Sequence, residues 1–122
     1  MHGVFIDAGH NYSGMDLGAS GCGLKEQEIT WYTADKLKNI LVNHGITVGM
    51  SRLSLTSNIG NTSVNDSLKA RVKLANQMNT DIFVSIHCNA GGGTGTETYA
   101  YSTGGQAYTL AQDVQSALVA VS

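Results

Sequence analysis

Short apolar runs alternate with amphipathic helical patterns along this chain, and this alternation limits the fold more than any other feature. Apolar runs at 4–6, 46–50 and 81–86 are separated by helical patterns. Strand, helix, strand, helix, strand in this order is typical of a parallel sheet with right-handed crossovers. The last run is almost continuously apolar, as in a strand that is covered on both faces. We therefore expect an α/β fold, with a mainly parallel twisted sheet and helices on both of its faces.

The two internal helical patterns predict which side chains are buried. In the first, from Glu26 to His44, one face is formed by Ile29, Thr33, Leu37, Ile40, Leu41 and His44. His44 followed by Gly45 is a typical helix end. The second helix is expected to be capped by Asn65 or Asp66. Its buried face is expected to consist of Leu68, Val72 and Ala75.

The C-terminal part of the chain predicts one more strand and one more helix. Glycines at 91–93 indicate a turn, and residues 96–101 alternate like a strand. An apolar stripe then runs from Ala107 to Val121, and no glycine, asparagine or basic residue closes this helix. We therefore expect a single domain, residues 1–122, that is incomplete at its C-terminal end.

Composition and charge exclude several classes of partner. The net charge is -2 and the few Lys and Arg residues are scattered, so neither nucleic acid nor anionic lipid is an expected partner. Apolar runs such as 82–84 are far too short to cross a membrane. The start of the chain shows neither a basic segment nor a long apolar one, which predicts synthesis in the cytoplasm without a signal peptide. With only Cys22 and Cys88, we expect both thiols to be reduced.

Three metal-binding side chains are expected at one edge of the sheet. His10 lies just past the first apolar run, and His87 directly follows the last. The carboxyl ends of parallel strands meet at the same edge, where open α/β folds bind ligands. The first helix begins at that edge with Glu26 in its first turn. Glu26 shares the apolar stripe of this helix, whereas Glu28 lies on the far side.

Two imidazoles and one inward carboxylate favour zinc. This donor set is known from catalytic zinc sites, in which the fourth position is left for water. Magnesium or calcium would need more oxygen ligands. Taken singly, each histidine also fits a hydrogen-bonding role and Glu26 fits a helix cap, so a structural α/β domain without metal remains an alternative.

Neighbouring polar residues have less specific roles. Asp7 and Asn89 are candidates to orient the ligand imidazoles by accepting their second N–H. Cys88 is expected to point to the opposite face, into the core. Cys22 lies in the loop near the site and is a rival ligand, and Tyr12 is placed to reach the cleft.

The chain resembles a known family in four ordered motifs that extend over nearly its whole length. These motifs are Ile6-Asp7-Ala8-Gly9-His10, Gly23-Leu24-Lys25-Glu26, Leu68-Lys69-Ala70-Arg71 with Ala75-Asn76, and Ser85-Ile86-His87-Cys88-Asn89-Ala90. They are similar to motifs of the zinc-dependent N-acetylmuramoyl-L-alanine amidases, which include autolysins and phage endolysins. The first motif alone is weak, but the ordered set is specific.

The resemblance implies hydrolysis of the amide between N-acetylmuramic acid and L-alanine in peptidoglycan. It implies Zn²⁺ as the cofactor and His10, Glu26 and His87 as its ligands. It also implies a protein that acts on the bacterial cell wall after release from the cell. A carboxylate would take the proton of the attacking water and pass it to the leaving amine.

The family's catalytic glutamate is the point at which this chain departs from the pattern. That residue lies in a segment resembling Glu-Leu-Gly-Phe, which the chain does not contain. Glu97 is the remaining well-placed acid, although we prefer a structural hydrogen-bonding role for it. The 122-residue chain alone is therefore expected to hydrolyse peptidoglycan poorly or not at all.

Two other functions would also involve a bound metal. A zinc deaminase needs a Pro-Cys-x-x-Cys motif, and the chain has no proline. A metal-bearing cell-wall binding fragment without turnover remains the alternative to an amidase.

Overall fold

A computed structural model describes residues 3–89 and 92–122. The chain divides into two compact units, Met1–Cys88 and Asn89–Ser122, and each is described by itself. The first unit contains the sheet and all three predicted metal ligands. The second contains the final helix and the segment that leads to it.

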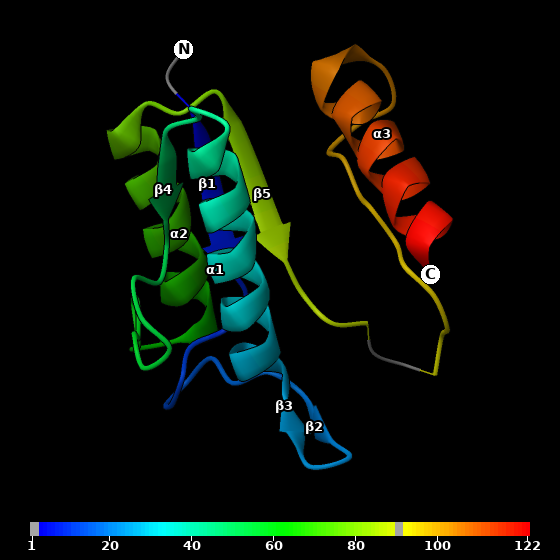
Figure 1. The fold of residues 1–122 in the computed structure, drawn as a ribbon. Helices are drawn as coiled ribbons and strands as arrows, with labels where there is room; N and C mark the ends of the chain where they lie inside the picture. Colours follow the sequence, from blue (N-terminus) through cyan, green and yellow to red (C-terminus); the bar gives the residue numbers. More distant parts are fainter. Residues whose placement is uncertain (1–2, 90–91) are drawn as a thin grey trace. The chain divides into compact units, whose positions relative to one another are not determined.

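A parallel three-stranded sheet forms the centre of the first unit (Figure 1). Its strands are β1 (Val4–Ala8), β4 (Val48–Met50) and β5 (Ile82–Ile86), in the order β4-β1-β5. In the register, Val4 lies opposite both Val48 and Ile82. The parallel α/β architecture predicted from the alternating pattern is confirmed.

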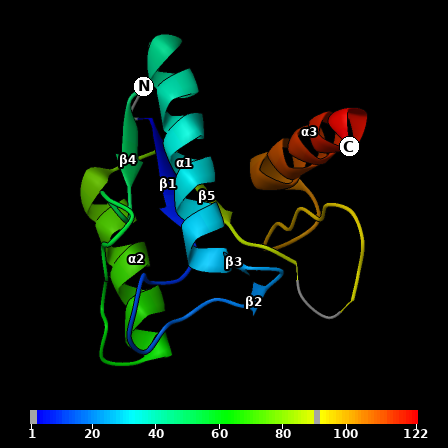
Figure 2. The same ribbon diagram turned by 60° about the horizontal axis from the view of Figure 1, so that its bottom comes forward.

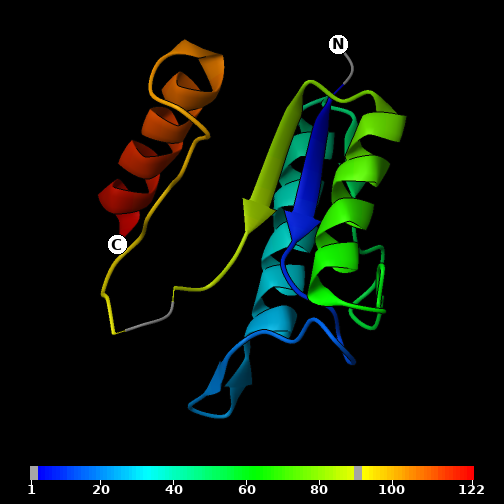
Figure 3. The ribbon, with the colours of Figure 1, turned by 180° about the vertical axis from the view of Figure 1, so that it is seen from behind.

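One helix covers each face of this sheet. Helix α1 (Glu26–Asn43) packs on one face and α2 (Val64–Met78) on the other, as Figures 1 and 3 show from opposite sides. The face toward α1 carries an apolar core formed by Val4, Ile6, Ala8, Ala34 and Met50. The face toward α2 is partly polar, because Asp7 follows Phe5 on that side of β1. The two faces of the sheet are therefore held by different chemistry.

A short hairpin leads into α1. Strands β2 (Ser20–Gly21) and β3 (Leu24–Lys25) pair antiparallel, and α1 begins at the next residue (Figure 2). The helix ends as predicted, with His44 as its C-cap and Gly45 at φ +78°. The hairpin thus fixes where the first turn of α1 starts.

The predicted buried faces of both helices are partly wrong. In α1 the buried residues are Glu26, Gln27, Thr30 and Ala34, whereas Ile29, Thr33 and Ile40 are exposed. Ala34 lies against the sheet, where a small side chain permits close packing. In α2, Ala75 is buried as predicted, but Leu68 and Val72 are 51% and 53% exposed. Ser67 and Arg71 are buried instead, because they bond to carboxylates at the carboxyl end of β1.

The predicted cap of α2 is also wrong. Ser63 is the N-cap, with extended backbone angles, and its hydroxyl accepts a 2.9 Å hydrogen bond from the Asp66 N–H. Asp66 accepts a hydrogen bond from Thr62. The hydrogen bonds with Thr62 and Ser63 hold the pKa of Asp66 below its usual value, and burial opposes this shift less strongly.

The second unit contains α3 (Gly105–Val121) but no strand in its described residues. The strand predicted at 96–101 is therefore wrong. A strand needs the backbone groups of a partner strand, and α3 is the regular element of this unit. Side chains hold the segment instead, since Gln115 donates to the Thr96 carbonyl oxygen and accepts from Thr98. Residue 91 of the predicted turn lies outside the described residues.

Among the described helices, none combines the length and the apolar character that a membrane span requires. Cys22 and Cys88 are free thiols. Burial and the nearby Glu26 carboxylate raise the pKa of Cys88, which keeps its thiol neutral at pH 7.

The capping assignment predicts that Ser63→Ala destabilises the first unit by about 1 kcal/mol, because the Asp66 N–H loses its acceptor. Urea unfolding followed by circular dichroism would measure the loss. Asn65→Ala is the matched control, since this expected cap makes no side-chain hydrogen bond in the described residues and its replacement should change stability by less than about 0.5 kcal/mol. The opposite ranking of the two variants would contradict the assignment.

Candidate metal centre

His10 lies in the tight loop that follows β1. The strand ladder extends to Gly9, whose N–H donates to the Ile86 carbonyl oxygen at 2.9 Å. His10 then adopts φ +67°, in the left-handed region that non-glycine residues seldom occupy. Asn11 closes the loop by donating its N–H to the Asp16 carbonyl oxygen at 2.7 Å. This turn directs the imidazole across the edge of the sheet.

Glu26 is the first residue of α1, and its side chain is buried at 7% exposure. Its Oε2 accepts the Ala19 N–H at 3.0 Å and its Oε1 accepts the Cys88 N–H at 2.9 Å. Burial raises the pKa of Glu26, but these two backbone hydrogen bonds and the neighbouring histidines outweigh it and bring the pKa below its usual value. Glu26 is therefore an ionised carboxylate at neutral pH.

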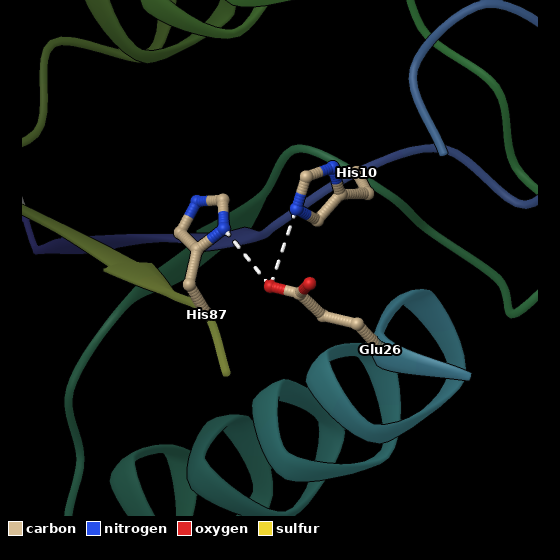
Figure 4. A group of neighbouring side chains, drawn as sticks. All are labelled: His10, Glu26 and His87. Atoms are coloured by element: carbon tan, nitrogen blue, oxygen red, sulfur yellow. Dashed lines mark ion pairs between the residues drawn. The ribbon is translucent and has the colours of Figure 1, made fainter. Parts of the chain in front are cut away.

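His87 completes the cluster from the end of β5 (Figure 4). Glu26 Oε1 lies 3.2 Å from His10 Nε2 and 3.4 Å from His87 Nδ1. The two imidazole rings stand edge to face with centroids 5.0 Å apart. The ligand atoms of the three residues all lie within 4.8 Å of one another. The structure thus brings together the three side chains that the sequence predicts as ligands.

Asp16 contacts the cluster, and sequence reasoning missed it. Its Oδ1 lies 2.9 Å from His10 Nδ1, and its Oδ2 accepts the Ser67 hydroxyl at 2.7 Å. Burial raises the pKa of Asp16, but the bonds from Ser67 and His10 outweigh it and lower the pKa. An ionised carboxylate only accepts hydrogen bonds, so the contact with Asp16 requires a proton on His10 Nδ1, and Nε2, which faces Glu26 Oε1 at 3.2 Å, is the nitrogen that would bind a metal. The sequence places Asp16 in a polar loop without periodicity, which gives no signal for this contact.

The two residues predicted to orient the imidazoles, Asp7 and Asn89, have other hydrogen-bond partners in the described part of the chain. Asp7 contacts neither ligand imidazole, because its carboxylate faces α2 and accepts bonds from Arg71 and Ser85, both at 2.7 Å. Asn89 belongs to the second unit, where its amide donates to the Gly95 carbonyl oxygen at 3.3 Å. For Asp7, the alternation of side chains along β1 explains the difference: it lies on the face opposite Ala8.

Cys22, Tyr12 and Glu97 were also singled out by the sequence, and all three are exposed. Cys22 is exposed at the hairpin turn and is not among the converging ligand atoms of the described residues. Tyr12 is exposed, and its carbonyl oxygen lies 3.5 Å from Gln27 Nε2. Glu97, in the second unit, accepts a 2.6 Å hydrogen bond from the Tyr99 hydroxyl, and this bond raises the pKa of Tyr99.

The donor set fits zinc better than a hard cation. Two neutral imidazoles and one carboxylate suit Zn²⁺, whereas Mg²⁺ and Ca²⁺ prefer several oxygen ligands. Glu26 is ionised, and the contact of His10 Nδ1 with Asp16 leaves His10 Nε2 facing the other two ligands. The His87 side chain is 46% exposed, which leaves one side of the cluster open to solvent.

Comparisons with known proteins find relatives of this chain in one family. The N-acetylmuramoyl-L-alanine amidase family matches the chain over residues 4–122. The amidase CwlM of Bacillus licheniformis is 42% identical over 111 residues, a match that covers 91% of this chain and 41% of that relative. The sporulation-specific N-acetylmuramoyl-L-alanine amidase of Bacillus subtilis strain 168 is 43% identical over 100 residues, which cover 80% of this chain and 35% of the relative.

The solved structures give the same result. The amidase AmiC2 of Nostoc punctiforme superposes with a TM-score of 0.70 at 34% identity, covering 91% of this chain and 57% of that one. The chain thus spans less than half the length of the two curated relatives, 41% and 35%. The match over residues 4–122 nevertheless includes both units. The chain belongs to the N-acetylmuramoyl-L-alanine amidase family.

Proposed function

We propose that this chain carries the zinc centre of a peptidoglycan amidase, with His10, Glu26 and His87 as ligands. The substrate is the amide bond between N-acetylmuramic acid and the L-alanine of the stem peptide. The observation that carries the proposal is the convergence of these three donors within 4.8 Å in a chain of the amidase family. The named relatives support the substrate class, and the donor set supports the metal.

The arrangement of charges favours amide hydrolysis over glycoside hydrolysis. Glycosidases generally use two carboxylates that flank the scissile bond. Here one carboxylate, Glu26, faces two imidazoles and is already held by two backbone N–H groups. Zinc bound to this set would polarise the scissile carbonyl and lower the pKa of a bound water to about 7. The chain's own residues keep Glu26 ionised and hold His10 Nδ1 against Asp16 Oδ1.

For Glu97 we propose the structural hydrogen-bonding role that the sequence favours, because its carboxylate accepts the Tyr99 hydroxyl at 2.6 Å within the second unit. Its segment is fastened to α3 through Gln115, and Tyr99 orients its carboxylate. A proton acceptor must affect turnover without affecting metal content. With the structural role, Glu97→Gln should change neither the hydrolysis rate nor the zinc content, whereas a lower rate at unchanged zinc content would identify Glu97 as the proton acceptor.

The zinc proposal predicts about one zinc per chain in protein purified without chelator. His87→Ala should retain little zinc, since one of three protein ligands is lost. Elemental analysis of both proteins measures this. His44→Ala is the matched control, because His44 is an exposed helix cap outside the cluster. No zinc in the parent, or equal zinc in the parent and His87→Ala, would refute the proposed ligands.

The close packing of Gly9 predicts a second effect on metal binding. A Cβ at Gly9 would lie 2.4 Å from Cε1 and 2.6 Å from Nδ1 of His87, and 2.7 Å from the Ile86 carbonyl oxygen. Gly9→Ala should therefore displace the His87 ring and weaken zinc binding at least about tenfold, as judged by competition with a coloured chelator. Gly21→Ala is the control, since nothing lies within 4 Å of the added Cβ. Equal affinities in the two variants would contradict this account.

The proposed reaction predicts which groups appear when the zinc-loaded chain is incubated with purified peptidoglycan. Free L-alanine amino termini should form, slowly for this chain, and no new reducing sugar ends should form. His87→Ala should abolish the release and His44→Ala should retain it. Release of reducing ends, or amine release that survives His87→Ala, would exclude the reaction. A zinc-loaded chain that sediments with peptidoglycan but releases nothing would indicate the binding fragment.

A further inference from the structure

The backbone at His10 needs an explanation beyond the ligand set. A left-handed conformation costs a non-glycine residue roughly 1–2 kcal/mol. Such residues persist only where the surroundings over-determine them. His10 has φ +67° and lies two residues past the end of β1, beyond the ladder that holds the strand. Other groups must therefore fix this turn.

Arg71 of α2 supplies those groups. Its side chain is only 2% exposed, and its two Nη atoms contact the end of β1 and the loop that follows it. Nη1 donates to the Ala8 carbonyl oxygen and to Asp7 Oδ1, both at 2.7 Å. Nη2 donates to the His10 carbonyl oxygen and to Asn11 Oδ1, both at 2.8 Å. One rigid guanidinium thus binds the backbone on both sides of the turn.

The same arginine reaches the imidazole of His10 through two side chains. Arg71 Nε donates to the Ser67 hydroxyl oxygen at 3.2 Å. That hydroxyl donates to Asp16 Oδ2 at 2.7 Å, and Asp16 Oδ1 holds His10 Nδ1 at 2.9 Å. The backbone and the ring of His10 are therefore fixed by one continuous network that starts on α2.

Stability alone does not require an arginine at this position. Replacing a buried ion pair by apolar side chains is often neutral or stabilising. A buried cation next to a site for a divalent metal would also disfavour the metal unless carboxylates neutralise it. Asp7, at 2.7 Å, and Asp16, at 4.0 Å, do so here. What an arginine adds is a planar fork of five donors in fixed directions, which lysine lacks.

We propose that Arg71 is a positioning residue of the metal centre, which sets the backbone turn and the ring orientation of His10. The inference rests on the proposed zinc site, but it concerns contacts that the chain makes without a metal. Arg71 contacts His10 at its backbone carbonyl oxygen and not at its imidazole, so it acts through the position of His10. Its removal should therefore change metal affinity and the state of the His10 ring together.

The test compares Arg71→Lys with the parent chain in two measurements. Zinc affinity, from competition with a coloured chelator, should fall about 10- to 100-fold, the usual effect of losing an outer hydrogen-bond partner. In metal-free protein at pH 8, imidazole ¹⁵N shifts should show His10 protonated on Nδ1 in the parent. Arg71→Lys should lower the fraction of His10 that carries a proton on Nδ1.

Phe5→Leu separates positioning from general destabilisation. Phe5 is fully buried on the same face of β1 as Asp7, and it stacks on Phe83 near the start of the strand. The Phe5→Leu variant should have a lower melting temperature but the zinc affinity and His10 ¹⁵N shifts of the parent. Unchanged zinc affinity, within twofold, and an unchanged His10 tautomer in Arg71→Lys would overturn the inference.

Ser67→Ala covers the case in which Arg71→Lys does not fold. It removes the hydroxyl between Arg71 and Asp16 at little cost in volume, and it should shift the tautomer balance and weaken zinc binding in the same direction. No change in either measurement would equally overturn the inference. If the parent binds no zinc, the proposed function fails, and the His10 tautomer alone decides the role of Arg71.

Discussion

The parallel pairing of β1 with β5 is the constraint on which the metal centre depends. Val4 lies opposite Ile82 and Ala8 opposite Ile86, so both strands end at the same level. His87 follows Ile86 directly, and His10 follows Ala8 after one glycine. A shift of one residue in this register would turn every side chain of β5 to the other face. The two imidazoles would then no longer converge on Glu26.

Burial of the Glu26 carboxylate is the second condition for the site. An unpaired buried charge is expensive, and the structure satisfies it with backbone N–H groups rather than with a fixed cation. Ala19 comes from the loop before the hairpin and Cys88 from the end of β5, so the carboxylate links both segments to the first turn of α1. The start of a helix also favours a negative charge. The site is thereby prepared to receive a cation.

The sequence was sufficient for the sheet and for the convergence of His10, Glu26 and His87, because strand order and strand ends determine both. It was insufficient where long-range polar contacts override apolar periodicity. Leu68 and Val72 have the apolar character of a buried helix face. Ser67 and Arg71 form the buried face of α2 instead, because they donate hydrogen bonds to Asp16 and Asp7. Asp16 itself lies in an irregular loop, whose path no local pattern specifies.

The two ends of the sheet consequently depend on different forces. Toward the amino ends of the strands, apolar contacts such as Phe5 on Phe83 hold the layers together, and such packing tolerates substitutions of similar volume. At the carboxyl ends, Arg52 and Arg71 bind the carbonyl oxygens of residues 8, 9 and 10 in succession. Hydrogen bonds of this kind depend on direction as well as distance. The turn that carries His10 is therefore held by hydrogen bonds from buried arginines, whereas the amino-terminal half of the sheet is held by apolar packing.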